Sequence, residues 1–328
     1  MKPFTKLSTI ALGAVIAFGA GTIATSQDAG AWEPKKPVQF VIMAGKGGGA
    51  DKAVRYMQSI IAKNKLSSKP FIPVNKPGGS GAEALIHVKN TSDPNHTIMF
   101  TLNSFYTTPL RNPKLGVDIS KFTPVGRMAE DTFLLWVHKD SGIKNVKQFV
   151  KAAKAKGNAW IMAGTGKGSE DNLLTDFLNK AYGLKMKYVP YKGGGRVAKE
   201  LAGNNANSTV NNPSEQLGFY QAGKTVPIGA FTPTRLPLFP NAPTFKELGK
   251  DFVYFMQRTV VGAPGMSKEA ATYYRQLFAK IYGSDKWQQY MNKKSLQGKF
   301  LTGDALMKYW LVQKEVQRGI LKKMGAIK

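Results

Sequence analysis

The chain has 328 residues, and its 47 Lys and Arg against 20 Asp and Glu give a formal net charge of +27. This length is too great for one small core and suits one large domain or two ordinary ones. Hydrophobic residues make up 42% and aromatic residues 11%, which excludes a disordered basic tail. Cysteine is absent, so disulfides, thiolate metal sites and cysteine nucleophiles are excluded as well.

The first 31 residues have the layout of a secretory signal peptide. Lys2 and Lys6 give a positive start, and residues 7–23 form an apolar stretch with several small residues. The triplet Ala-Gly-Ala at 29–31 matches the small-residue cleavage rule, so we expect cleavage after Ala31 and export to a bacterial periplasm. An uncleaved membrane anchor is the alternative, and the cleavage triplet argues against it.

Export argues against reading the positive net charge as a sign of DNA binding, because an exported protein does not meet the chromosome. The signal segment carries two Lys and one Asp, which leaves +26 on the mature chain. We therefore expect no nucleic-acid partner. Phosphate contacts need only basic patches, so a polyanion ligand stays open as an alternative.

Strands and helices alternate along the mature chain. Short β-branched and apolar runs predict strands, and apolar residues three and four apart predict helices, which together indicate a parallel α/β sheet. In the first part, strands are expected at 38–43, 71–74 and 96–102, and helices at 53–61 and 82–88. A second unit begins near residue 131, with strands expected at 133–137, 160–163 and 187–191 and helices at 145–156, 173–178 and 196–201. The chain then crosses back through a strand at 256–263 and closes with helices at 267–293 and 303–323.

Glycine-rich loops join a strand to a helix at 45–51, 75–81, 164–171 and 192–195. Backbone N–H groups at a helix N-terminus are unpaired and partly positive, so this arrangement can hold an anion, and glycine lets the main chain approach it. A single loop of this kind can use glycine for shape alone. Several of them, spread over two αβ units, predict a cleft that binds an acidic small molecule.

Other functional classes find little support. Residues 45–50 fit the dinucleotide pattern G-x-G-x-x-A, but the next strand ends at 74–76 without the acidic residue that would hold a ribose. No P-loop or G-x-S-x-G elbow occurs. His87, His96 and His138 lack metal-ligand spacing. We therefore expect no cofactor, no metal site and no enzymatic activity.

Several polar residues have more than one possible role. Asp51 and Asp171 stand where helices begin, so each carboxylate either caps free N–H groups or contacts a ligand. Ser169 follows a glycine, but no sequence feature supplies a base that would activate it. The lysine-rich helix at 144–156 is expected to present a solvated face.

Segments spread along the chain carry a resemblance to a known family. They are VIMAGKGGGADKAVR at 41–55, PVNKPGGSGA at 73–82, DPNHT at 93–97, FTPV at 122–125, VPYKG at 189–193, Arg235 with LFPNAPT at 238–244 and ELG at 247–249, and APG at 263–265. In this order they resemble the extracytoplasmic solute receptors of the tripartite tricarboxylate transporter system, the Bug-type periplasmic binding proteins. The likeness covers nearly the whole mature chain.

The resemblance implies an α/β, two-lobed class II periplasmic binding protein fold, or Venus flytrap, with a ligand cleft between the lobes. Residues 32–130 and 256–328 would form lobe 1, and 131–255 lobe 2, after a signal peptide at 1–31. The ligand would be a small organic carboxylate enclosed by hinge closure. Membrane permease subunits of the transporter would be the partners of a monomeric receptor.

In this family, backbone N–H groups and waters of the first two glycine loops hold the ligand carboxylate. Carried over by motif, and with the loops of lobe 2 added, the implied ligand-binding residues are Gly45, Lys46, Gly47, Gly48, Gly49, Ala50, Asp51, Pro77, Gly78, Gly79, Ser80, Gly81, Ala82, Thr165, Gly166, Lys167, Gly168, Ser169, Asp171, Lys192, Gly193, Gly194, Asn211 and Asn212. Lys46 and Lys167 either add charge to the anion site or point into solvent.

Departures from the family pattern affect the identity of the ligand more than the fold. Many members carry Pro-Pro-Gly-Gly where this chain has Gly-Lys-Gly-Gly at 45–48, and many carry a His at the position of Asn172. Two other functions stay open as alternatives: a ligand-sensing module that docks on a signalling partner, and a periplasmic enzyme. The missing nucleophile and metal constellations disfavour the enzyme.

Overall fold

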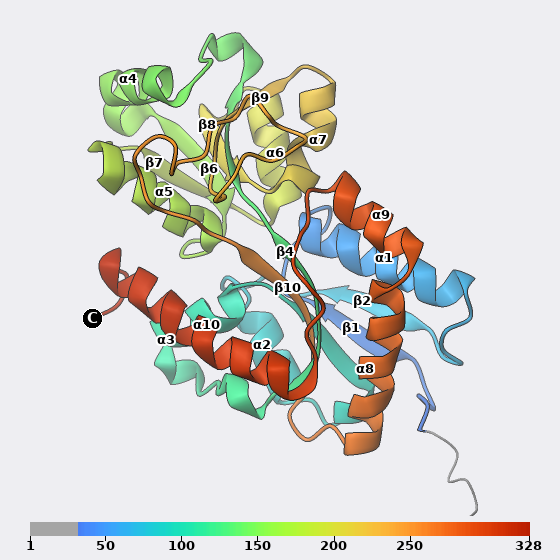
Figure 1. Cartoon of the computed structure of the whole chain (residues 1–328). Helices are drawn as coiled ribbons and strands as arrows, with labels where there is room; N and C mark the ends of the chain where they lie inside the picture. Colours follow the sequence, from blue (N-terminus) through green and yellow to red (C-terminus); the bar gives the residue numbers. More distant parts are fainter. Residues whose placement is uncertain (1–31) are drawn as a thin grey trace, which may run out of the picture. The chain divides into compact units, whose positions relative to one another are not determined.

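Two five-stranded β-sheets organise residues 32–328, the part of the chain that the computed structural model describes (Figure 1). The signal peptide and cleavage site expected over 1–31 lie outside the described residues. The first sheet has the order β2 (Phe71–Asn75), β1 (Val38–Ile42), β3 (Thr97–Thr101), β10 (Met256–Gly262) and β4 (Thr123–Asp131). The second has the order β7 (Lys187–Tyr191), β6 (Ile161–Thr165), β8 (Ser208–Asn211), β5 (Leu134–His138) and β9 (Thr225–Ala230).

Each five-stranded sheet contains four strands that run in one direction and one reversed strand. In the first sheet β1 pairs parallel with β2 and β3, and β10 pairs antiparallel with β3 and β4. In the second sheet β6 pairs parallel with β7 and β8, and β5 pairs antiparallel with β8 and β9. The reversed strand arrives from the other sheet, because β5 follows β4 directly and β10 brings the chain back. The expected parallel direction therefore holds for four strands of each sheet, and β10 and β5 run against it.

Helices flank both sheets. Those nearest the first sheet are α1 (Gly49–Lys63), α2 (Ala82–Lys89), α3 (Ser104–Arg111), α8 (Lys268–Tyr282), α9 (Asp285–Lys293) and α10 (Gly303–Lys323). Those of the second are α4 (Val146–Lys156), α5 (Glu170–Tyr182), α6 (Gly194–Ala202) and α7 (Pro213–Gln221). Single-turn 3₁₀ helices occur at Pro94–His96, Pro113–Leu115, Ile119–Lys121, Lys139–Ser141 and Gly157–Ala159. Among the helices of residues 32–328, none has the length and apolar character that a membrane span requires.

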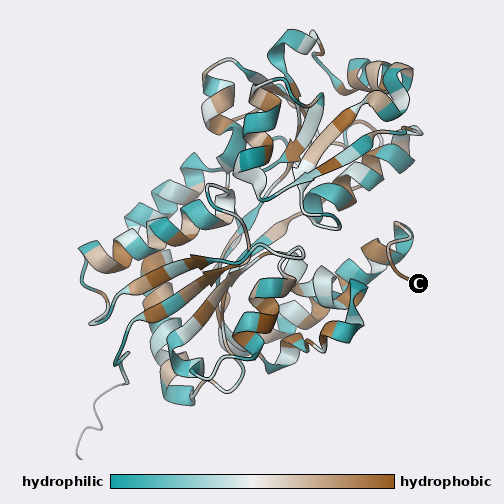
Figure 2. Ribbon diagram, turned by 180° about the vertical axis from the view of Figure 1, so that it is seen from behind, coloured by the Kyte–Doolittle hydropathy of each residue, from teal (hydrophilic) through white to brown (hydrophobic). Residues whose placement is uncertain are grey.

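The inner strands β1 and β3 of the first sheet are buried on both faces, which explains why they read as short continuous apolar runs. Phe40 and Ile42 on β1 pack into one cluster with residues of α1, α8 and α9, whereas Val41 packs on the opposite face with residues of α2, α3 and α10. Figure 2 shows hydrophobic residues along these strands and hydrophilic residues on outer helix faces. On α4, Lys147 and Lys151 are exposed, as the spacing predicts.

The structure differs from the sequence prediction in two respects. The single helix expected at 267–293 is two helices, because the chain breaks at Gly283 and Ser284 Oγ caps α9 by accepting from Trp287 N at 3.3 Å. The second difference is a set of unpredicted elements: α3, β4, β8, α7 and β9. Pro109 inside α3, and Pro124 and Gly126 inside β4, hide the periodicity that would reveal these two elements.

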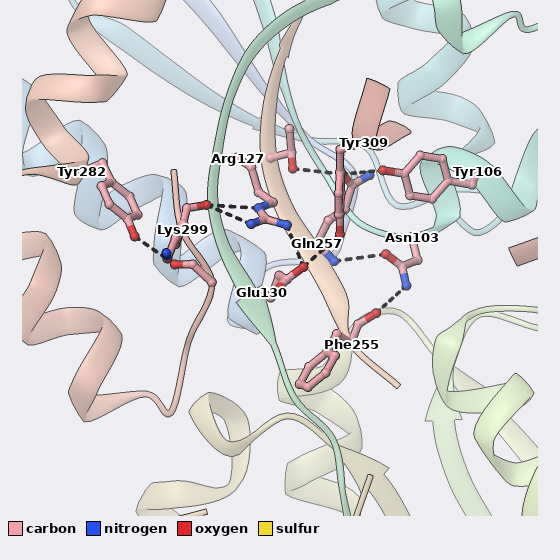
Figure 3. A network of polar contacts seen from close by, with 11 residues as sticks. Asn103, Tyr106, Arg127, Glu130, Phe255, Gln257, Tyr282, Lys299 and Tyr309 are labelled. Atoms are coloured by element: carbon pink, nitrogen blue, oxygen red, sulfur yellow. Dashed lines mark hydrogen bonds and ion pairs between the residues drawn. The ribbon is translucent and has the colours of Figure 1, made fainter. Parts of the chain in front are cut away.

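Asn103, which precedes α3, ties that helix to the strand that returns from the second sheet (Figure 3). Its Nδ2 donates to Phe255 O at 2.7 Å, and its Oδ1 accepts from Gln257 N at 3.0 Å. The side chain of Gln257 accepts from the Tyr106 hydroxyl at 2.8 Å. These groups are buried, so their satisfied hydrogen bonds fix α3 against β10.

Arg127 on β4 lies beside this network (Figure 3). Its Nη1 pairs with Glu130 Oε1 at 2.7 Å, its Nε and Nη2 donate to Lys299 O, and the ring of Tyr309 lies 4.6 Å from its Cζ. The Tyr309 hydroxyl also donates to Glu130, at 3.0 Å. β4 is thereby joined to α10 and to the segment that precedes it.

We predict that Asn103→Ala destabilises the protein, because it leaves a buried carbonyl and a buried N–H group without partners. The free energy of unfolding should fall by about 2–4 kcal/mol, as measured by chemical denaturation. Asn292→Ala, on the exposed face of α9, is the matched control and should change stability by less than about 0.5 kcal/mol. Equal effects of the two substitutions would contradict the role of Asn103.

A candidate ligand-binding cavity

A cavity of about 840 Å³ lies where the parallel strands of both sheets end. The loops that follow β1 and β2 form one part of its wall, and those that follow β6 and β7 form another. α3, β10 and the start of α7 complete the wall. This is the position at which open α/β sheets bind ligands, because the helix N-termini point toward it.

Most of the residues implied as ligand-binding lie on the cavity wall. They are Gly45, Gly48, Gly49, Ala50, Pro77, Gly78, Gly79, Ser80, Ala82, Thr165, Gly166, Lys167, Ser169, Asp171, Lys192, Gly193, Gly194 and Asn212. The structure places the others off the wall: Lys46, Gly47, Asp51, Gly81, Gly168 and Asn211. Lys46 and Lys167 are both exposed, and of the two only Lys167 borders the cavity. Their contact with a ligand stays a prediction.

Asp51 and Asp171 fold back onto the loops that precede their own helices. Asp51 Oδ2 accepts from Gly47 N at 2.9 Å, and Asp171 Oδ2 accepts from Thr165 N at 2.8 Å. Each carboxyl group thus satisfies an amide of the segment that precedes its own helix, and contact of either residue with a ligand stays a prediction. Burial raises the pKa of Asp51, but hydrogen bonds from Arg55 and Gly47 outweigh it and hold the pKa below its ordinary value.

Glu215, which no motif indicated, reaches across the cavity from α7 to the first glycine loop. Its Oε1 accepts from Gly49 N at 2.9 Å, and its Oε2 accepts from Asn211 Nδ2 at 2.7 Å. Gly194 leaves the space for this carboxylate, because an added Cβ would come within 2.1 Å of Oε1. The amide of Gly49 at the start of α1 is therefore satisfied by a side chain from the other half of the structure.

Further contacts bridge the cavity from one sheet's loops to the other's. Ser80 Oγ donates to Lys167 O at 2.9 Å, and Ser104 N donates to Glu170 Oε1 at 2.8 Å. Gly45 packs directly on the main chain of Lys192, since an added Cβ would lie 2.2 Å from that carbonyl oxygen. The two sides of the cavity are in contact at several points.

A buried ion pair borders the cavity through Arg258. Arg258 on β10 donates from Nε to Asp131 Oδ2 at 3.0 Å and from Nη2 to Asn212 Oδ1 at 3.2 Å. Burial raises the pKa of the Asp131 carboxyl to about 6, and the charge of Arg258 opposes this rise. Gly49 packs on the guanidinium, which leaves no room for a side chain there.

Arg111 is a second wall residue that sequence reasoning missed, because α3 itself was not predicted. It is the last residue of that helix, and its guanidinium lies against Gly168. Gly168 has a φ of +78°, and an added Cβ would come within 1.5 Å of Arg111 Nη1. Only glycine suits both the backbone conformation and the close approach.

The described residues hold no group of metal-ligating side chains and no activated nucleophile at the cavity. No cluster of three or more His, Asp or Glu suited to a metal ion occurs within 32–328. Ser169 Oγ accepts from the Thr165 hydroxyl at 2.8 Å, and the wall contains no histidine.

Comparisons with known proteins agree with this geometry. A family model described as a tripartite tricarboxylate transporter family receptor matches residues 54–325. The UPF0065 protein in the gbd 5'region of Cupriavidus necator is 22% identical over 297 residues, which are 90% of this chain and 89% of that protein. The fold is similar to that of the periplasmic binding protein BugD, with a TM-score of 0.84, 21% identity and coverage of 89% of this chain and 99% of that one. An R. palustris protein solved with adipate has a TM-score of 0.81, 22% identity and coverage of 89% and 98%. The chain thus has a periplasmic binding protein fold.

We predict that Asp171→Asn gains stability over the wild type as the pH rises. Burial raises the pKa of Asp171 well above its ordinary 3.8, and the nearby Glu215 carboxylate adds to the rise. The folded protein therefore holds this proton more tightly than the unfolded chain does. The stabilisation is complete below about pH 4 and is lost as the pH passes through the folded pKa. Asparagine can still accept from Thr165 N but cannot ionise.

The measurement is the free energy of unfolding of both proteins from pH 4 to pH 8. The difference between variant and wild type should grow in favour of the variant toward neutral pH. Asp251→Asn, at an exposed position, is the control and should give a constant difference. A pH-independent difference for Asp171→Asn would count against a raised pKa.

Proposed function

The chain belongs to the tripartite tricarboxylate transporter receptor family, and from this we propose that it captures an organic carboxylate in the cavity and delivers it to membrane permease subunits. The observation that carries the proposal is a cavity onto which the glycine loops of both sheets open. Helix N-termini and glycine amides favour an anion at such a place. The family match favours this receptor role over the sensing and enzymatic alternatives.

The compartment and the chain organisation complete the proposal. Receptors of this family are periplasmic, and a signal peptide over 1–31 with cleavage after Ala31 would deliver the mature chain there. We propose that 32–130 and 256–328 form one lobe and 131–255 the other, with the crossing strands as the hinge. The two separate sheets, joined through β4 and β10, support this division. The receptor would act as a monomer.

We predict that an organic carboxylate stabilises the protein against heat. A ligand at 100 times its dissociation constant adds about 2.7 kcal/mol to the free energy of unfolding. A thermal-shift screen of mono-, di- and tricarboxylates measures this, with the corresponding amides and alcohols as neutral controls. The proposal fails if no carboxylate raises the melting temperature and no organic acid copurifies with the protein.

We further predict that Asp51→Ala weakens binding of the carboxylate found in that screen, whereas Lys151→Ala leaves binding unchanged. Asp51 does not border the cavity, but its hydrogen bonds to Gly47 and Arg55 hold the first loop in shape. Loss of such a charge-assisted bond costs about 1.5–3 kcal/mol, or roughly tenfold or more in affinity. Calorimetric titration measures the affinity of each variant. Unchanged affinity in both variants would show that the first loop takes no part in binding.

A further inference from the structure

Lysines gather at the end of the second sheet that lies away from the cavity. β6, β7 and β8 run toward the cavity wall, so they begin at the opposite end of the sheet, and β5 ends there at His138. α4 follows β5 and lies at this outer end (Figure 1). We use the term basic end for the exposed lysines of α4 and of the neighbouring connections: Lys139, Lys144, Lys147, Lys151, Lys154, Lys156, Lys185, Lys187 and Lys224.

The basic end has almost no acidic side chain to balance its charge. α4 contains no Asp or Glu. The connections at this end are 139–145, 157–160, 183–186, 203–207 and 222–224, and Asp140 is the one acidic residue in them. Its carboxylate lies 3.8 Å from His138 Nδ1. Within residues 32–328, no amino group of the basic end takes part in an ion pair, so ions from solution balance its charge.

The stability of α4 does not explain its lysines. Lys147 lies in the first turn, where the helix dipole disfavours a positive charge. Lys147 and Lys151 are four residues apart, and Lys151 and Lys154 are three apart, so like charges are neighbours on one exposed face. Both arrangements destabilise the helix slightly. An anionic surface outside the protein would relieve the repulsion.

The composition of the basic end favours a lipid surface over a protein partner. Protein interfaces are enriched in Arg and aromatic residues and depleted in Lys, whereas 139–160 contains five more lysines after Lys139 and no Arg. Among the described residues, the exposed large hydrophobic side chains lie outside the basic end, at Ile72, Ile86, Leu238, Leu248, Leu311, Val312 and Val316. Flexible, hydrated ammonium groups suit the diffuse negative charge of phospholipid headgroups, which requires no fixed geometry.

We propose that the basic end binds the surface of an anionic phospholipid bilayer. Clusters of this kind bind such surfaces because each lysine close to the headgroups raises the partition into the membrane roughly fivefold. The glycine loops lie at the other end of the sheet, so this contact leaves them free. The inference goes beyond the proposed receptor function, to which it would add a means of holding the protein near the membrane permease.

Sedimentation with vesicles tests this assignment, using the protein purified from the periplasm. One vesicle type contains equal parts of phosphatidylglycerol and phosphatidylcholine, and the other contains phosphatidylcholine alone. The protein should bind the first type and not the second. NaCl at about 1 M, which shortens the screening length to about 3 Å, should release it.

Two triple variants separate the basic end from net charge alone. Lys147→Gln, Lys151→Gln and Lys154→Gln together should lower the partition into anionic vesicles roughly 100-fold. The matched control replaces three exposed lysines of helices beside the first sheet by Gln: Lys63, Lys280 and Lys293. It removes the same charge and should lower the partition far less.

A measurement on the wild type needs no variant. Anionic vesicles should protect Lys151 from an amine-reactive reagent and leave Lys280 as reactive as before, as read by mass spectrometry. Equal loss of binding in both triple variants, binding that persists in about 1 M NaCl, or equal protection of the two lysines would overturn the assignment. Failure of the wild type to bind anionic vesicles would also overturn it and would favour an acidic protein as the partner. Each of these results leaves the receptor function standing, because carboxylate binding is measured separately.

Discussion

The ion pair between Arg258 and Asp131 lies where the chain passes from one sheet to the other, and much of the site depends on it. Asp131 ends β4, Arg258 is on β10, and both side chains are almost fully buried. Removing one partner would leave an uncompensated buried charge, which is far more costly than losing an exposed pair. Through Asn212 the same guanidinium reaches α7, and through Gly49 it touches α1. The Arg258 guanidinium thus contacts the crossing strands, the first glycine loop and the second sheet.

Sequence reasoning located the features that depend on local chemistry. Strands followed by glycine loops and helices can be recognised because glycine, capping residues and apolar spacing act over a few neighbours, and these placed most of the cavity wall. Arg111 and Glu215 could not be found this way. Each matters because of a partner far away in the sequence, Gly168 for one and Gly49 for the other, and only the tertiary fold creates these neighbours.

The positive charge that dominates the composition is not the property that shapes the cavity. Exposed lysines such as Lys147 and Lys151 contribute to it on an outer helix face. The wall, by contrast, includes three buried acidic side chains, Glu170, Asp171 and Glu215, each of which accepts a backbone N–H. A basic exterior raises the local concentration of anions near the protein, whereas selection among them falls to individual side chains within. Attraction and discrimination are therefore separate properties of this chain.

The contacts that bridge the cavity also bear on the rates at which a solute would bind and dissociate. The Ser80 hydroxyl holds the Lys167 carbonyl, and the Glu215 carboxylate holds the Gly49 amide, so loops from both sheets are joined over the space in which a solute would rest. On the proposed hinge closure, parting of the two lobes would break these bonds. The frequency of that opening would then limit both capture and release of a solute. The lifetime of the complex would then depend on the hydrogen bonds between the loops as much as on the ligand's own contacts with the protein.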